Sequence, residues 1–93
     1  MTEHDALQIA RREIVALIQR SDQLSHFKFD PAELHSEYER CWVFAAGSEE
    51  MLEAGYAPAA VFVYLDKADG HRWTTEEIGE YFSQPRQPLR VAA

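Results

Sequence analysis

Seven consecutive apolar residues at positions 59–65 constrain this chain more than any other feature. The run is rich in β-branched and aromatic residues and is followed by a turn signal at Asp69-Gly70, so it predicts a central β-strand over 59–66. Both alternating sets of its side chains are apolar, and such a strand must be covered on both faces. A chain of 93 residues has little material left to provide that cover.

Helical periodicity predicts one long helix and two short ones. A capping pattern at Thr2 precedes an apolar stripe that begins at Leu7, which predicts a helix over about 3–20. Residues 48–54 predict a short inserted helix that ends at Gly55. A second capping box at Thr74 starts a short C-terminal helix, with apolar residues on one face and a proline break at Pro85.

The remaining segments predict extended chain. Residues 38–46 predict a second strand that is apolar on both faces, and residues 71–73 predict a short returning strand after the turn. Residues 24–37 are ambiguous, because Asp30-Pro31 favours at most one helical turn while Leu34 shares the parity of Tyr38 in an extended alternative. Residues 26–29 alternate and can form a short edge strand.

This order of elements predicts an α+β fold. We expect the N-terminal helix to pack on a small, mostly antiparallel sheet of three to four strands, with the short inserted helix and the short C-terminal helix completing the structure. Residues 1–84 are expected to form a single domain and residues 85–93 a flexible tail. The second face of the sheet would be covered by the C-terminal helix or by another protein.

The charge balance favours a basic protein partner. Sixteen acidic residues outnumber nine basic ones, which gives a net charge of −7 and disfavours nucleic acids and anionic membrane surfaces as partners. Cys41 is the single cysteine and suits a reducing compartment. The N-terminus lacks the basic and apolar regions of a signal peptide, and no apolar run is long enough to span a membrane, so a cytoplasmic location is expected.

Residues that carry chemistry are present but poorly spaced for catalysis or metal binding. His35 and Cys41 are separated by about 20 Å along an extended strand, and the pairs of ligands typical of a zinc site do not occur. Cys41 is interpreted as a buried structural thiol. We therefore expect no catalytic residue, no metal and no cofactor, although an enzyme that uses Cys41 or His71 stays as a third possibility.

Aromatic and acidic side chains form the predicted partner-binding set. The aromatic members, together with Phe62, have the core of the protein as their alternative explanation, and the acidic members have solvated helix faces as theirs. An uncovered sheet face with aromatic anchors and an acidic rim is typical of a protein-binding patch. The predicted set is Tyr38, Trp42, Phe44, Tyr64, Trp73, Glu49, Glu50, Glu53, Glu76, Glu77 and Glu80.

The middle of the chain resembles a known family. Its segments are Trp42-Val43-Phe44, a short helix ending at Gly55, and an apolar strand that ends in the residues Leu65-Asp66-Lys67-x-Asp69-Gly70. In these segments the chain is similar to the YrhB-like small immunity proteins of bacterial polymorphic-toxin systems, over residues 38–83. The resemblance implies a cytoplasmic protein that binds and neutralises a cognate toxin domain without catalysis.

The predicted function is therefore a non-catalytic protein-binding domain, and specifically an immunity-type inhibitor of a toxin. The alternative is a small homodimeric domain of unknown function, whose open sheet face is its own interface. Such a dimer would bind a small ligand or serve as a structural module. The two hypotheses differ in what covers the second face of the sheet: a basic partner or a second copy of the chain.

Overall fold

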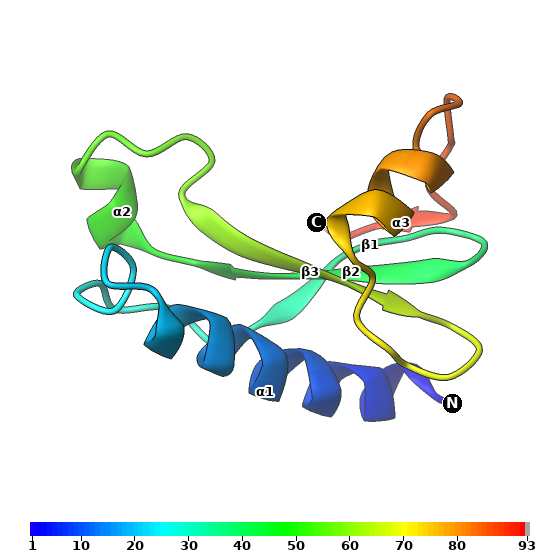
Figure 1. Ribbon diagram of the computed structural model, residues 1–93, viewed down its shortest axis with the longest axis horizontal. Helices are drawn as coiled ribbons and strands as arrows, with labels where there is room; N and C mark the ends of the chain where they lie inside the picture. The colour runs from blue at the N-terminus through cyan, green and yellow to red at the C-terminus, as the bar shows by residue number, and fades with distance from the viewer. Residues whose placement is uncertain (93) are drawn as a thin grey trace.

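A four-stranded antiparallel sheet with helices on both faces organises this computed structural model, which describes residues 1–92 (Figure 1). The predicted α+β fold, with its leading helix and its mostly antiparallel sheet, is confirmed. In chain order the elements are α1 (Glu3–Arg20), β1 (Glu33–Glu37), β2 (Cys41–Gly47), α2 (Glu49–Glu53), β3 (Ala60–Asp66), α3 (Thr75–Tyr81) and β4 (Arg90–Val91).

The strand order is β3-β2-β1-β4, which corrects the prediction of a central strand over 59–66. That segment, β3, lies at one edge of the sheet, and β2 has neighbours on both sides. Part of the outer edge of β3 is closed by the returning chain, since Leu65 forms a bridge with Arg72 and the Trp73 amide donates to the Tyr64 carbonyl. Its apolar character on both faces reflects helices on both sides of the sheet.

The ambiguous segment before β2 is extended from residue 33 onward. No helical turn forms at Asp30-Pro31, so the extended alternative for this segment is confirmed, whereas the short edge strand considered for residues 26–29 does not form. The predicted strand over 38–46 begins at Cys41 instead, because the Tyr38 amide donates to the Cys41 carbonyl across a tight β1–β2 turn. The pairing of β1 with β2 is irregular between Leu34 and Ser36, where one extra residue is accommodated.

Helix α1 packs along one face of the sheet through small and aliphatic residues. Thr2 caps its first turn by accepting from the Asp5 amide, and the buried stripe of the helix is Ala6, Ala10 and Ile14. Two alanines at this contact allow the helix to approach the strands closely. The sheet residues beneath the helix include Trp42, Phe44, Ala46, Val63 and Leu65, all buried.

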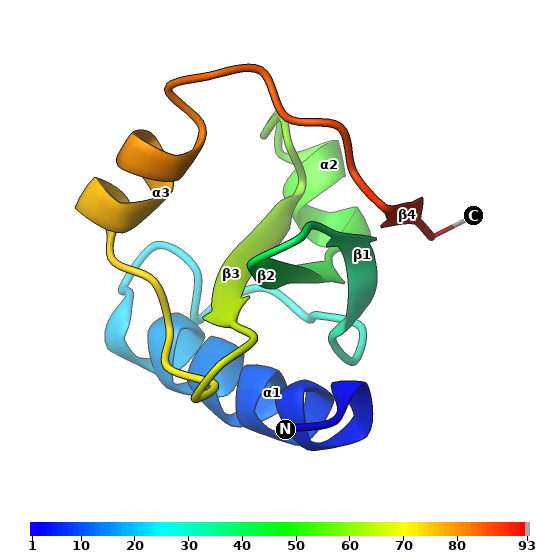
Figure 2. The ribbon, with the colours of Figure 1, turned by 90° about the vertical axis from the view of Figure 1, so that its right-hand side faces the viewer.

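The C-terminal segment, which the sequence predicts to be a flexible tail, reaches the sheet in the described residues. It crosses from α3 to the outer edge of β1, where Arg90–Val91 form β4 (Figure 2). The Leu89 amide donates to the Glu37 carbonyl, and the Arg90 guanidinium forms ion pairs with Glu37 and with Glu3 of α1. Backbone pairing and charge therefore fix the segment to the sheet up to residue 92, and Ala93 lies outside the described residues.

Candidate functional site

The second face of the sheet, which carries α2 and α3, is the candidate site because it is only half covered. Side chains from Cys41, Val43 and Ala45 of β2 point to this face, opposite the α1 side. Cys41 and Val43 are buried, but Ala45 is partly exposed, although β2 has neighbouring strands on both sides. The cover therefore ends partway along the strand.

Helix α3 covers the first half of this face with aromatic rings. Trp73 and Tyr81 are buried against Cys41 and Val43, and their rings meet edge to face with centroids 5.0 Å apart. Phe82 makes similar edge contacts with Tyr38 and Tyr64, at 5.0 Å and 5.8 Å. Rings packed in this geometry stabilise a core beyond their buried area.

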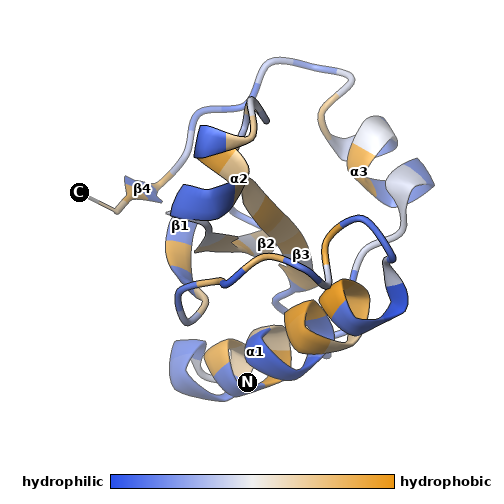
Figure 3. Ribbon diagram, turned by 90° about the vertical axis from the view of Figure 1, so that its left-hand side faces the viewer, coloured by the Kyte–Doolittle hydropathy of each residue, from blue (hydrophilic) through white to orange (hydrophobic). Residues whose placement is uncertain are grey.

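The open half lies between α2 and α3, and we call it the saddle. Figure 1 shows the two helices at opposite ends of the same face, and in Figure 3 much of the β3 ribbon between them is hydrophobic. The ring of His35 meets the ring of Phe62 edge to face at 5.3 Å, so both lie on this surface. The register places five residues on the saddle, and the contact with Phe62 adds His35: Glu33, His35, Ala45, Gly47, Ala60 and Phe62.

Three predicted partner-binding residues are corrected by the structure. Trp42, Phe44 and Trp73 are 7%, 1% and 6% exposed, so they belong to the core and cannot anchor a partner. Pairing of Trp42 with Leu65 puts the first two beneath α1, and α3 packs over the third. Tyr38 and Tyr64 are half-buried at the α3 end of this face, where both rings contact Phe82.

The predicted acidic residues divide into free and engaged groups. Glu50 accepts a hydrogen bond from the Lys28 amide at 2.7 Å, and Glu77 accepts from the Thr74 amide and binds His71. The others are exposed and form no ion pair with any residue of 1–92: Glu49, Glu53, Glu76 and Glu80. These free carboxylates lie on the two helices that flank the saddle.

Sequence reasoning missed most of the saddle itself. Small residues are common in strands, so Ala45, Gly47 and Ala60 give no signal of a binding surface in the sequence. Only the β2–β3 register shows that they meet on one surface. The signal that was available is the change in side-chain size along β2, from Val43 to Gly47. Such a gradient predicts less cover at the end of a strand.

A polar hollow of about 370 Å³ lies at the α3 end of this face. Buried Trp73 and Tyr81 contribute to its lining, and the Trp73 indole donates to Asp66 at 2.9 Å. Arg86 lies over the Tyr81 ring at 4.0 Å and donates to the Tyr81 carbonyl. Because the lining also contains Arg40, Glu77 and Glu80, the hollow has charges of both signs and does not select one ion.

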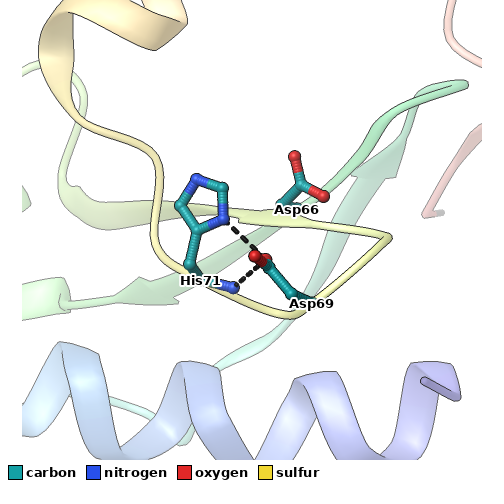
Figure 4. A group of neighbouring side chains, drawn as sticks. All are labelled: Asp66, Asp69 and His71. Atoms are coloured by element: carbon teal, nitrogen blue, oxygen red, sulfur yellow. Dashed lines mark hydrogen bonds and ion pairs between the residues drawn. The ribbon is translucent and has the colours of Figure 1, made fainter.

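The turn after β3 brings together the one group of side chains with metal-ligand chemistry in residues 1–92, namely Asp66, Asp69 and His71 (Figure 4). Their potential ligand atoms lie within 4.8 Å of one another. Protein donors already engage the carboxylates: Asp69 accepts from the amide and ring of His71, and Asp66 accepts from the Ala68 amide and the Trp73 indole. We interpret the group as a set of bonds that stabilises the turn.

His71 connects this turn to α3. Its ring is 2.9 Å from Glu77 and 2.6 Å from Asp69, and these hydrogen bonds raise the pKa of His71 to about 9. The imidazole is therefore protonated at neutral pH, a form that cannot bind a metal or act as a general base.

The thiol of Cys41 is placed for packing rather than reaction. It is completely buried, and the loss of solvation raises its pKa to about 11. A thiol in this state is almost entirely protonated at neutral pH and is a poor nucleophile. The site therefore offers shape, aromatic surface and negative charge.

No protein-family model, curated protein or solved structure matches this chain. None of the helices described for residues 1–92 has both the length and the apolar character needed to cross a membrane.

Proposed function

We propose that this chain is a non-catalytic protein-binding domain that acts as an immunity-type inhibitor, with the saddle as its contact surface for a basic toxin domain. The observation that carries the proposal is the half-covered second face, where a central strand exposes Ala45 while the same strand is buried under α3. An exposed apolar surface of this kind is typical of an interaction site.

Electrostatics favour a basic partner for this surface. Glu33 lies on the saddle, and the two flanking helices carry free carboxylates at Glu49, Glu53, Glu76 and Glu80. Charges of one sign around an apolar centre steer an oppositely charged protein and accelerate its association. The same charges repel nucleic-acid phosphates and anionic lipids.

The resemblance to YrhB-like immunity proteins supports the more specific assignment. Its segment contains β2, α2 and β3, which supply most of the saddle. A buried, unpaired Cys41 fits the cytoplasm, which is where we propose that the inhibitor acts.

Co-expression with a toxin domain encoded beside this chain tests the function. We expect growth to be restored, and the purified pair to bind with an affinity that falls roughly tenfold or more when salt rises from low to high concentration. The double variant Glu33→Lys/Glu49→Lys should weaken binding, while Asp22→Lys, an exposed acidic site before β1, should not. Absence of a neighbouring toxin gene, unprotected growth or salt-independent binding would count against the proposal.

Sedimentation of the purified chain tests the homodimer alternative. A monomer over the whole concentration range leaves the saddle open to a partner. A stable dimer that is dissociated by Ala45→Arg would show that the saddle is a homodimer interface.

A further inference from the structure

The helical layer on the second face is incomplete in its middle. Helix α2 begins directly after β2, while α3 packs on Cys41 and Val43 at the start of the same strand (Figure 1). A strand as long as β2, with seven residues, places these two ends about 20 Å apart. A helix with its side chains is about 10 Å across. Half the width of each flanking helix leaves about 10 Å between them, which is the width of one further helix.

The floor of the saddle allows a close approach. Ala45, Gly47 and Ala60 form its centre, and a Cβ built on Gly47 would meet nothing nearer than the Ala59 carbonyl oxygen at 3.9 Å. Phe62 and His35 stand beside these small residues as adjoining rings. A flat floor with an aromatic wall is a surface on which an apolar helix stripe can pack.

Addition of a strand is less favourable, because both edges of the sheet are partly occupied. Residues 71–73 pair with the outer edge of β3 from Tyr64 to Asp66, and β4 pairs with β1. The outer edge of β3 before Tyr64 leaves only residues 60–63 for a further strand. The free area is therefore on the face of the sheet, where a helix packs.

We propose that the saddle binds a cationic amphipathic helix of the partner protein, an inference that rests on the proposed function and specifies the partner element. Its apolar stripe would lie over Ala45, Ala60 and Phe62. Lysines or arginines on its flanks would pair with Glu33 on the floor and with the free carboxylates of α2 and α3. Charge complementarity selects this occupant over a second copy, because each copy carries a net charge of −7.

A synthetic peptide isolates this inference. The probe is a labelled 14-residue peptide of leucine and lysine in helical amphipathic order. One control peptide has the same composition in scrambled order, and a second has proline at its centre. We expect the amphipathic peptide to bind, to gain helical circular dichroism, and to shift the amide resonances of Ala45 and Phe62. Equal binding of all three peptides would overturn the proposal.

Variants locate the contact. Ala45→Arg and Ala60→Arg place charge and bulk on the floor, and we expect each to weaken peptide binding by about tenfold or more. Val15→Arg is the matched control, since Val15 is an exposed apolar residue, 51% accessible, on α1. Thermal unfolding identifies any variant that fails to fold, and the other floor variant then gives the result. Unchanged binding by a folded floor variant overturns the helix proposal alone, whereas unprotected growth overturns the proposed function.

Discussion

The two faces of the sheet are made by the same strands yet are covered in different ways. Under α1 the helix contributes only aliphatic residues, from Ala6 to Ile14, and these pack on buried sheet residues that include Trp42, Phe44 and Leu65. On the other face the cover is aromatic and stops at the saddle. The α1 face therefore holds the larger buried core, while the second face leaves part of its surface uncovered.

The largest expected effect compares a phenylalanine from each face. Phe44 is 1% exposed beneath α1, and Phe44→Ala should lower the free energy of unfolding by about 3–5 kcal/mol through lost burial and a cavity. Phe62 lies half-buried on the saddle, and Phe62→Ala should cost only about 1 kcal/mol. Chemical denaturation measures both values. Equal losses of unfolding free energy in the two variants would contradict the proposal that the α1 face contributes more to stability than the second face.

A second comparison concerns the two glycines with positive φ. Gly70 (φ 74°) lies where an added Cβ would meet the side chains of Met1 and Ile9 at the α1 end, so Gly70→Ala should cost about 2–4 kcal/mol. Gly55 (φ 92°), after α2, has open space around it, and Gly55→Ala should cost only about 1–2 kcal/mol. Thermal unfolding of the pair checks whether the α1 side is the more tightly packed.

A stabilising change is expected on α3. Gly79 lies inside this seven-residue helix without a positive φ, and an added Cβ would contact nothing within 4 Å. Gly79→Ala should therefore raise the free energy of unfolding by about 0.5–1 kcal/mol. Loss of stability would mean that α3 is packed more tightly than its exposure indicates.

The smallest expected effect is the pH dependence of stability that arises from His71, which connects the turn after β3 to Glu77 of α3. Because folding raises the pKa of His71 from its ordinary 6.5 to about 9, its contribution is complete below pH 6.5 and is lost as the pH rises through 9. Solvent screens both of its ion pairs, so the change should be modest. The melting temperature of the native protein should fall more between pH 7 and pH 10 than that of His71→Gln. Parallel curves would show that His71 does not hold α3 in place.

Elements with their own local signals were predictable from the sequence. The N-cap at Thr2, the capping box at Thr74 and the apolar run of β3 locate α1, α3 and the strand, because short-range hydrogen bonds and periodicity decide those elements. Strand β4 has only two residues and depends on pairing with β1 and on Glu3, far away in the sequence. No local pattern contains that information.

Of the candidate site, the sequence indicated the charges on the flanking helices and one aromatic residue, Phe62. Acidic residues are common in the first turn of a helix, which accounts for the free carboxylates on α2 and α3. Whether an aromatic ring is buried depends instead on which alternating set of β2 side chains faces α1. Pairing of Trp42 with Leu65 decides this, and it places Trp42 and Phe44 inside while Phe62 lies on the saddle. A periodicity of two defines two faces without saying which one is covered.

The ion pair between Glu3 and Arg90 has a topological consequence. Since residues 87 positions apart are in direct contact, a short flexible linker can join the two ends, and the backbone can be reopened in the exposed loop after Gly55. Such a circular permutant would leave the strand order of the sheet unchanged while placing its new ends beside α2. A reporter fused there would lie beside the saddle, so a change in its signal would measure binding of the proposed partner helix.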